Sequence, residues 1–456
     1  MLFSSITFIY YFLPILLLIY FITKNKYKNI VLLIFSLLFY FLGEPKYIII
    51  LILSCILNYF FGNVINKSNK KKLWLSLAII YNVGQLLIFK YTDFFIYNIN
   101  NILNTNINYL YIVMPIGISF FTFQALSYVI DIYKNRYKPS KSLLDFMTYI
   151  SLFPQLVAGP IVRYQDIKEE LKDKDINENN VAKGITRFVI GLSKKVLLAN
   201  VLGEIIKDLI EVDVLSSWLK PILYTLQIYF DFSGYSDMAI GLGLILGFKF
   251  LENFNYPLIA SSITDFWRRW HISLSSWFKD YVYIPLGGNR NGLLKQIRNI
   301  LIVWFLTGFW HGASWNFIIW GLYFGILLII EKLFLKKYLD KTKIIKYIYT
   351  ILIVIISFLI FSSDNISNIF IELKNMFMIN KIPLITKTTL SVLKSNIIFI
   401  IISIISSTPL MKILLNKLKN NKMINILEII FIILLLTLST AFLIDESFNP
   451  FLYFRF

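Results

Sequence analysis

The residues of this chain best suited to acid–base chemistry are its two histidines, His271 and His311. His311 stands in TGFWHGASWNF, between tryptophans and in a segment apolar enough for a lipid bilayer. Burying an imidazole costs free energy unless its nitrogens find partners. With an unperturbed pKa of about 6.5, an imidazole is mostly neutral at neutral pH and can accept a proton. His311 is therefore a candidate general base acting on an acceptor hydroxyl. The alternative is a histidine that is satisfied within a packed core.

A second polar segment, DFWRRWH, holds Asp265, Arg268, Arg269 and His271. Arginine can donate two hydrogen bonds to a phosphate or a carboxylate, so this segment is a candidate entrance for an anionic or carrier-borne substrate. Interleaved tryptophan and arginine are also typical of an interfacial helix, with tryptophan at the lipid headgroups and arginine side chains extended towards water. Both interpretations stay open at this point.

Two aspartates, Asp231 and Asp237, fall inside an apolar span predicted over 220–250. Ionisable groups inside a membrane are costly and usually functional. Six residues apart, the two carboxylates do not share a face of an ideal helix. The structural alternative is that each aspartate bonds to backbone or caps a broken helix.

Several kinds of site are absent from the sequence. There is no GxSxG, no Gly-rich phosphate loop, no HExxH and no Cys/His spacing for a metal, so we expect no metal. The one cysteine, Cys55, can form neither an internal disulfide nor a redox pair, and we expect it to pack in an apolar core.

Composition assigns the chain to the membrane. It is 57% hydrophobic, with long apolar runs such as 2–22 and 423–444, and about 20 apolar residues suffice for a helix to cross a bilayer. The first run has no basic region before it and no small-residue cleavage site, so we expect a retained helix. The net charge of +19 comes from lysines between the apolar runs, which indicates orientation by the positive-inside rule and no nucleic-acid partner.

The expected fold is an all-α, multi-pass protein of the cytoplasmic membrane, with about 10–12 spanning or re-entrant segments in one domain over 1–456. The basic clusters at 24–28, 67–72 and 134–141 should all be cytoplasmic. An Asn-rich loop over 98–108 should therefore be outside, and so should the end of the chain. Residues 143–163 are interrupted by prolines, and 262–296 are too polar to face lipid. Spans are predicted at 3–22, 29–42, 46–62, 73–90, 110–131, 183–210, 220–250, 298–312, 315–335, 345–362, 396–408 and 424–444.

Four stretches resemble the membrane-bound O-acyltransferase superfamily, and within it the branch of the alginate O-acetyltransferase membrane subunit. They are MPIGISFFTFQALSYVID, FPQLVAGPIVRY, DFWRRWHISLSSWFKDYVYIPLGGNR and TGFWHGASWNFIIWG. The resemblance extends from the N-terminus to about residue 335. The D-alanyl transferase branch shares the WHG histidine but is less similar in the other stretches.

The resemblance implies a helical bowl around a transmembrane tunnel. His311 matches the essential histidine of the family and His271 a supporting one. The donor would be a cytoplasmic acyl thioester, with acetyl-CoA expected and no bound cofactor, entering near Arg268 and Arg269. Substrate-binding residues would be Asp265, Arg268, Arg269, Trp310 and Asn316. The acyl group, expected to be acetyl, would be used for O-acylation of an exported or cell-wall polysaccharide through a separate, esterase-like extracytoplasmic protein.

The C-terminal residues 447–456, ending in SFNPFLYFRF, form an aromatic tail that we expect outside the membrane. Interfacial anchoring is one interpretation. The tail also resembles a short C-terminal motif in which a tyrosine is proposed as an acyl relay, which makes Tyr453 a candidate carrier.

The alternative to an acyltransferase is a transporter or lipid flippase that uses Asp231, Asp237 and His311. Inverted repeats would favour it, and the sequence shows none. A scaffold for an exported complex is a third possibility.

Overall fold

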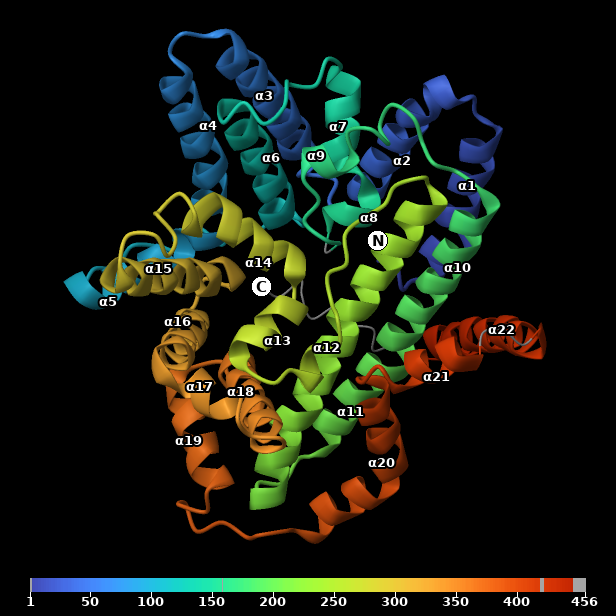
Figure 1. Ribbon diagram of the computed structural model, residues 1–456. Coiled ribbons are helices and arrows are strands. Elements are labelled where there is room, and N and C mark those ends of the chain that lie inside the picture. The colour runs from blue at the N-terminus through green and yellow to red at the C-terminus, as the bar shows by residue number, and fades with distance from the viewer. Residues whose placement is uncertain (1, 158, 419–421, 446–456) are drawn as a thin grey trace. The chain divides into compact units, whose positions relative to one another are not determined.

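The computed structural model describes residues 2–157, 159–418 and 422–445 and contains only helices and connecting segments within these ranges (Figure 1). The prediction of an all-α chain is confirmed. The helices group into two compact units, Met1–Phe188 with Ser236–Glu252, and Val189–Tyr235 with Asn253–Phe456. Helices α10 and α12 contribute residues to both units. The single domain expected over 1–456 stays a prediction.

The first unit contains the N-terminal helices. Helix α6 packs on α3 and α4, and α7 packs on α2. Its elements are η1 (Phe8–Phe12), α1 (Leu13–Ile22), η2 (Asn25–Tyr27), α2 (Lys28–Gly43), α3 (Ile48–Lys67), α4 (Lys71–Leu86), η3 (Leu87–Tyr91), α5 (Thr92–Leu103), α6 (Ile118–Tyr133), α7 (Leu143–Ser151), α8 (Phe153–Leu156), α9 (Tyr164–Ile167) and parts of α10 (Glu178–Ser193) and α12 (Val214–Ile245).

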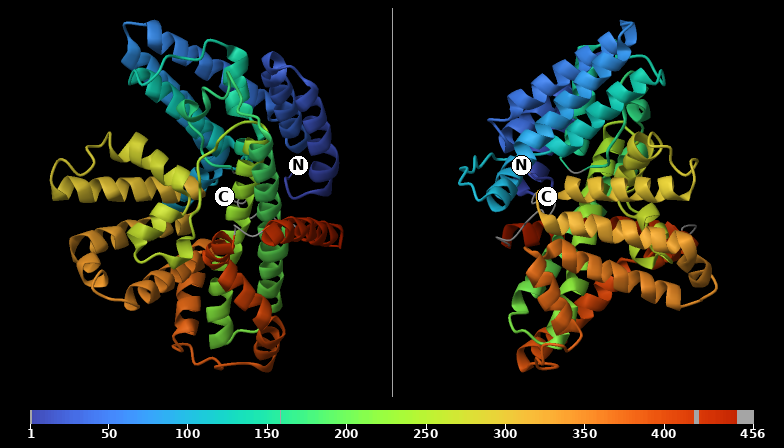
Figure 2. Two further views of the ribbon diagram at one scale, coloured as in Figure 1. Left: turned by 45° about the vertical axis from the view of Figure 1, so that its right-hand side comes forward. Right: turned by 90° about the vertical axis from the view of Figure 1, so that its left-hand side faces the viewer.

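The second unit contains both histidines. In it, α15 and α16 lie side by side (Figure 2). Besides its parts of α10 and α12, its elements are η4 (Lys194–Asn200), α11 (Val201–Asp208), η5 (Pro257–Ile259), α13 (Ile263–Arg269), α14 (Ile272–Phe278), η6 (Lys279–Tyr283), α15 (Leu293–His311), α16 (Trp315–Ile330), η7 (Glu331–Leu335), α17 (Lys336–Leu339), α18 (Ile345–Ser362), α19 (Ile366–Met376), α20 (Lys387–Ser406), α21 (Leu410–Leu418) and α22 (Lys422–Asp445).

Seven helical segments among the described residues are long and apolar enough to cross a bilayer. They make this a multi-pass membrane protein, as predicted. The seven are Asn25–Gly43, Ile48–Lys67, Lys71–Leu103, Trp315–Leu339, Ile345–Ser362, Lys387–Ser406 and Ile426–Asp445, and two shorter apolar helices are Phe8–Ile22 and Ile118–Tyr133.

Two predicted boundaries in the first unit were wrong. The span expected over 73–90 continues through the π-helical turn η3 to Leu103, so the asparagine-rich loop begins only at Asn104. The span expected from residue 110 begins at Ile118, because Gly117 before it has a φ of 73°, outside the right-handed helical region. A side chain at Gly117 would also overlap the backbone oxygen of Leu156. The interruption predicted within 143–163 is confirmed, since α7 ends at Ser151.

The polar segment 262–296 packs within the second unit through its aromatic face. Trp267, Trp270 and Trp277 are buried. The Trp267 ring lies 4.5 Å from that of Trp304 on α15 and 4.9 Å from that of Phe324 on α16. Tryptophan buries a large apolar area and prefers tilted or edge contacts of this kind. The segment is thus held by ring packing.

A buried carboxylate, Glu331, anchors the start of α13. It is 1% exposed and accepts hydrogen bonds from the backbone N–H of Ile263 at 2.6 Å and of Thr264 at 2.9 Å, and from the Thr264 hydroxyl at 2.8 Å. The first N–H groups of a helix have no partner within the helix. Glu331 therefore satisfies two of them and fixes α13 to the end of α16.

The crossing of α15 and α16 depends on two glycines. A methyl group at Gly308 would overlap the backbone oxygen of Phe317, and one at Gly321 would overlap that of Trp304. Because each glycine has no side chain, the two backbones touch there. This contact fixes the part of α15 that leads to His311.

We predict that residue 106 is outside the cell and residue 69 inside. In a Cys55→Ala background, a membrane-impermeant maleimide should label Asn106→Cys in intact cells and Asn69→Cys only after permeabilisation. Both asparagines are exposed and Cys55 is buried, so reactivity reports the side of the membrane. Labelling of Asn69→Cys in intact cells would contradict the orientation derived from the lysine clusters.

We predict that Glu331→Gln destabilises the protein in detergent. The amide would place an NH₂ group against backbone N–H donors, and a buried donor without an acceptor costs on the order of 2 kcal/mol. The measurement is the thermal unfolding midpoint, with the partly exposed Glu372→Gln as the control. An equal midpoint for both variants would show that the carboxylate does not hold α13.

Candidate active site

His311 is the last residue of α15 and lies in an enclosure of aromatic rings. Its side chain is 5% exposed. Its ring centroid is 4.9 Å from that of Trp310, 4.8 Å from that of Trp320 on α16 and 5.4 Å from that of Phe361 on α18. All three contacts are close to edge-on, so three helices restrict the orientation of the imidazole.

Gly312 allows this enclosure to close. A side chain at Gly312 would overlap the ring of Phe317. With glycine there, Phe317 packs 5.0 Å from Phe361, which in turn contacts His311. The glycine after the histidine is therefore required by close packing, since its backbone is extended, with a φ of −171°.

His271 is buried in a second polar cluster. It precedes α14 with a φ of 44°, a left-handed conformation that is uncommon outside glycine. Its Nδ1 lies 3.1 Å from the side-chain oxygen of Asn253. That oxygen also accepts from the backbone N–H of Ser273 at 3.2 Å and from its hydroxyl at 2.9 Å. The Ser273 N–H can only donate, so the Asn253 atom is the acceptor oxygen and Nδ1 of His271 carries the proton.

The surroundings of His271 keep it neutral. Burial lowers the pKa of His271 to about 3, because a charged imidazole loses its hydration there. The ring is 1% exposed and lies edge-on to Phe232 at 4.7 Å. With the proton on Nδ1, Nε2 is the acceptor side of the ring.

Trp310 connects the two histidines. Its ring lies 6.1 Å from His271 and 4.9 Å from His311. The fold thus brings two histidines that are forty positions apart in the sequence to neighbouring sides of one tryptophan. Roles for His271 and His311 in one site were expected from the resemblance alone and stay a prediction, and both rings contact Trp310.

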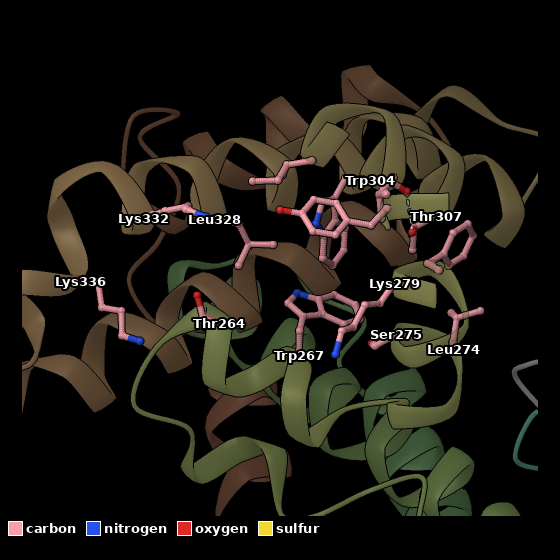
Figure 3. A pocket seen from close by; sticks show the side chains of 14 residues that line it. Thr264, Trp267, Leu274, Ser275, Lys279, Trp304, Thr307, Leu328, Lys332 and Lys336 are labelled. Atoms are coloured by element: carbon pink, nitrogen blue, oxygen red, sulfur yellow. Dashed lines mark hydrogen bonds between the residues drawn. The ribbon is translucent and has the colours of Figure 1, made fainter. Parts of the chain in front are cut away.

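A pocket of about 430 Å³ lies beside this cluster (Figure 3). One wall of the pocket is apolar and aromatic. It consists of Trp267 and Trp304, whose rings meet edge to face, together with Leu274 and Phe278. Three lysines also line it. Figure 3 shows Lys332 and Lys336 at one end of the pocket and Thr307 at the other. The third lysine, Lys279, lies beside Trp267 and Ser275. The remaining lining residues are Thr264, Tyr283, Ile300, Val303 and Leu328.

Thr307 links the pocket to the histidine. It lies four residues before His311 on α15, and side chains at this spacing share one face of a helix. The end of the pocket farthest from Lys332 and Lys336 therefore lies on the face of α15 that carries His311. An elongated ligand with an anionic end and a small apolar end matches this arrangement.

Three other predicted substrate residues, Asp265, Arg269 and Asn316, make hydrogen bonds within the protein. Asp265 accepts from Arg269 Nε at 2.9 Å. Arg268 is exposed and is not among the residues that line the pocket. The Asn316 amide donates to the backbone oxygen of Ser363 at 2.8 Å. Substrate binding by Asp265, Arg268, Arg269, Trp310 and Asn316 stays a prediction.

The two aspartates of α12 belong to different units, and each has a cationic partner. Asp231 pairs with Lys195 at 2.6 Å, with both side chains 2% exposed. Asp237 pairs with Arg187 at 2.8 Å. Helix α12 is continuous at both positions, so neither aspartate caps a broken helix. The partners were not expected, because a single sequence does not show which distant cation meets a buried carboxylate.

Sequence reasoning missed four residues of the second unit. Lys332 and Lys336 looked like ordinary solvated charges, and Asn253 and Glu331 lie far in sequence from the groups that they bind. Lys279, by contrast, belongs to the polar cluster that the sequence had already marked as a candidate entrance. A signal for Glu331 was present, since it is an acidic residue directly after a long apolar run. Tyr453 and the tail 447–456 lie outside the described residues, and their roles stay predictions.

Known proteins resemble this chain over much of its length. Residues 134–371 match the membrane-bound O-acyltransferase family. The probable alginate O-acetylase of Azotobacter vinelandii is 38% identical over 378 residues, covering 80% of this chain and 76% of the relative. The peptidoglycan O-acetyltransferase of Helicobacter pylori is 37% identical over 427 residues, covering 84% and 81%. The teichoic acid D-alanyltransferase of Bacillus subtilis is 31% identical over 269 residues, covering 54% and 68%.

These relatives share an activity class, the transfer of an acyl group, and the family match includes both histidines and the lysine-lined pocket. These relatives therefore favour an acyltransferase over a transporter and over a scaffold. The chain belongs to the membrane-bound O-acyltransferase family and is a multi-pass membrane acyltransferase.

Proposed function

We propose that this protein transfers an acetyl group from a cytoplasmic thioester, such as acetyl-CoA, for O-acylation of an exported or cell-wall polysaccharide. The observation that carries the proposal is the pocket with lysines at one end and Thr307, on the His311 face of α15, at the other. Two relatives are named for O-acetylation of alginate and of peptidoglycan, which supports acetyl and a polysaccharide.

The pocket suits a thioester carried by a phosphate-bearing group. Lys279, Lys332 and Lys336 offer positive charge to phosphates, and lysine binds phosphate as a point charge. The apolar wall between Trp267 and Trp304 suits an uncharged linker and a short acyl group. Lys332 and Lys336 belong to a lysine-rich segment that the positive-inside rule assigns to the cytoplasm, where an acyl thioester would be available.

His311 would act as the general base. Its imidazole accepts the proton of the acceptor hydroxyl while the hydroxyl oxygen forms a bond to the thioester carbonyl carbon. The carbon–sulfur bond then breaks, and the leaving thiolate takes the proton from the imidazolium. The rings of Trp320 and Phe361 limit rotation of the imidazole, and a fixed orientation lowers the entropic cost of reaching the reactive geometry.

His271 would support this step without exchanging the transferred proton. Asn253 fixes its tautomer, and its ring packs on Trp310 next to His311. Replacing it would loosen Trp310 and reduce the fraction of molecules with His311 correctly placed. A separate extracytoplasmic enzyme remains our proposal for the final transfer, with Tyr453 as a candidate relay.

We predict that His311→Ala lowers acyl transfer by about 10²–10⁴-fold, the usual effect of losing a general base. The measurement is transfer of radiolabelled acetyl from acetyl-CoA by purified protein in lipid nanodiscs. His271→Ala should cause a smaller loss, and Asn253→Ala should resemble it, because both act through Trp310. Near-normal turnover in a folded His311→Ala variant would exclude the proposed base.

We predict that Lys279→Ala, Lys332→Ala and Lys336→Ala combined raise the KM for acetyl-CoA about tenfold, since each partly exposed ion pair contributes up to about 1 kcal/mol. The matched control is Lys337→Ala, a neighbouring exposed lysine that is not among the lining residues. The wild-type KM should rise with salt more steeply than that of the triple variant. An unchanged KM in the triple variant would assign the donor to another site.

A further inference from the structure

We propose that the loop after α5 forms a binding site for an uncharged polysaccharide on the outer face of the membrane. The choice of a polysaccharide rests on the proposed function, whereas the site itself is argued from the first unit alone. The loop borders an open hollow of about 750 Å³, within the range of about 300–1,000 Å³ that is common for ligand sites. Figure 1 shows α5, from which the loop leaves.

The lining of this hollow has the chemistry of sugar recognition. Six of the eleven residues from 98 to 108 are asparagine, and Asn101, Asn104, Asn106 and Asn108 line the hollow together with Tyr109 and Tyr111. A side-chain amide offers both donors and acceptors, which match the hydroxyl and acetamido groups of a sugar. The two tyrosine rings, with centroids 5.9 Å apart, offer flat apolar surfaces for its C–H faces.

The loop is shaped before any ligand binds. The Asn100 side-chain oxygen accepts from the Thr105 hydroxyl and from the Ile107 N–H, each at 2.9 Å, and its amide donates to the Ile107 oxygen at 2.9 Å. Asp93 on α5 accepts from the Leu110 N–H at 2.8 Å. These bonds join both ends of the loop to α5, so a ligand would meet a preformed surface and less binding energy would be lost to ordering.

The absence of charge defines the ligand further. None of the nine described residues that line the hollow is charged. A polyuronate such as alginate would find no lysine or arginine among these residues to pair with its carboxylates. The site therefore fits neutral sugars that carry hydroxyl and amide groups.

The position of the loop matches an exported polymer. The lysines at 70–72 lie at the start of the span Lys71–Leu103, and Lys134 and Arg136 follow α6. The positive-inside rule assigns both clusters to the cytoplasm, and the loop between α5 and α6 is then outside. A glycan strand leaving the cell would meet it there.

The test is binding of chitotetraose, a neutral sugar with acetamido groups, to the full chain in lipid nanodiscs. Saturation-transfer NMR should show saturable binding of chitotetraose and weaker binding of tetramannuronate, an anionic oligomer. Asn106→Ala with Asn108→Ala should weaken chitotetraose about tenfold, since two neutral hydrogen bonds together contribute about 1–2 kcal/mol. Tyr109→Ala should also weaken it. Asn98→Ala is the control, because Asn98 lies on α5 outside the hollow and its amide donates to the Phe94 oxygen.

A second variant separates an effect on sugar binding from a loss of the loop structure. Asn108→Asp keeps the side-chain shape and adds a negative charge, and it should weaken tetramannuronate more than chitotetraose. The site is refuted if chitotetraose shows no saturable binding, if tetramannuronate binds more tightly, or if the asparagine variants bind as the wild type does.

Binding and acyl transfer can fail independently. His311→Ala should bind chitotetraose as the wild type does, because the sugar assay uses no acyl donor. If the wild type binds the sugar but transfers no acetyl group, the proposed function is wrong and the sugar site is supported. If it transfers acetyl but binds no sugar, the sugar site is wrong and the proposed function is supported.

Discussion

The structure depends on one constraint: a polar group removed from water in a membrane protein must find its partner within the chain. Glu331 meets this constraint by binding the first N–H groups of α13, and Asp231 does so by pairing with Lys195. His271 meets it through Asn253. Each of these contacts joins segments far apart in the sequence, so satisfying the polar groups also fixes how the helices of the second unit are arranged.

Aromatic packing supplies the precision that these polar contacts alone would lack. The α15–α16 crossing at Gly308 and Gly321 brings the two backbones into contact, which holds Trp320 beside His311. Trp267 reaches the same helices from α13. Large rings have few ways to pack at native density, so the shapes of the surrounding rings restrict the orientation of the His311 imidazole.

The division of the pocket into a charged end and an apolar end supports the proposed donor. Lys332 and Lys336 lie at one end of the pocket, Trp267 and Trp304 line its aromatic wall, and Thr307 lies at the other end. A thioester with a phosphate-bearing carrier has the same polarity along its length. The pocket and the proposed donor agree in the order of their charged and apolar parts. Agreement in order is stronger support for this donor than the presence of lysine or tryptophan alone.

The sequence by itself determined the all-helical membrane class, because apolar runs of spanning length and lysines between them depend only on local composition. It also singled out His311 and His271, since buried histidines are rare and the surrounding motifs are specific. It misplaced two helix ends, near residues 90 and 110. A π-helical turn continues the first helix to Leu103, and the Gly117 conformation delays the start of the next one to Ile118. Only the tertiary structure decided that Trp310 lies between the histidines, that Lys279 joins Lys332 and Lys336 around one pocket, and that Glu331 holds α13. These are contacts between distant segments, and their partners are selected by packing in three dimensions, which no local pattern of residues encodes.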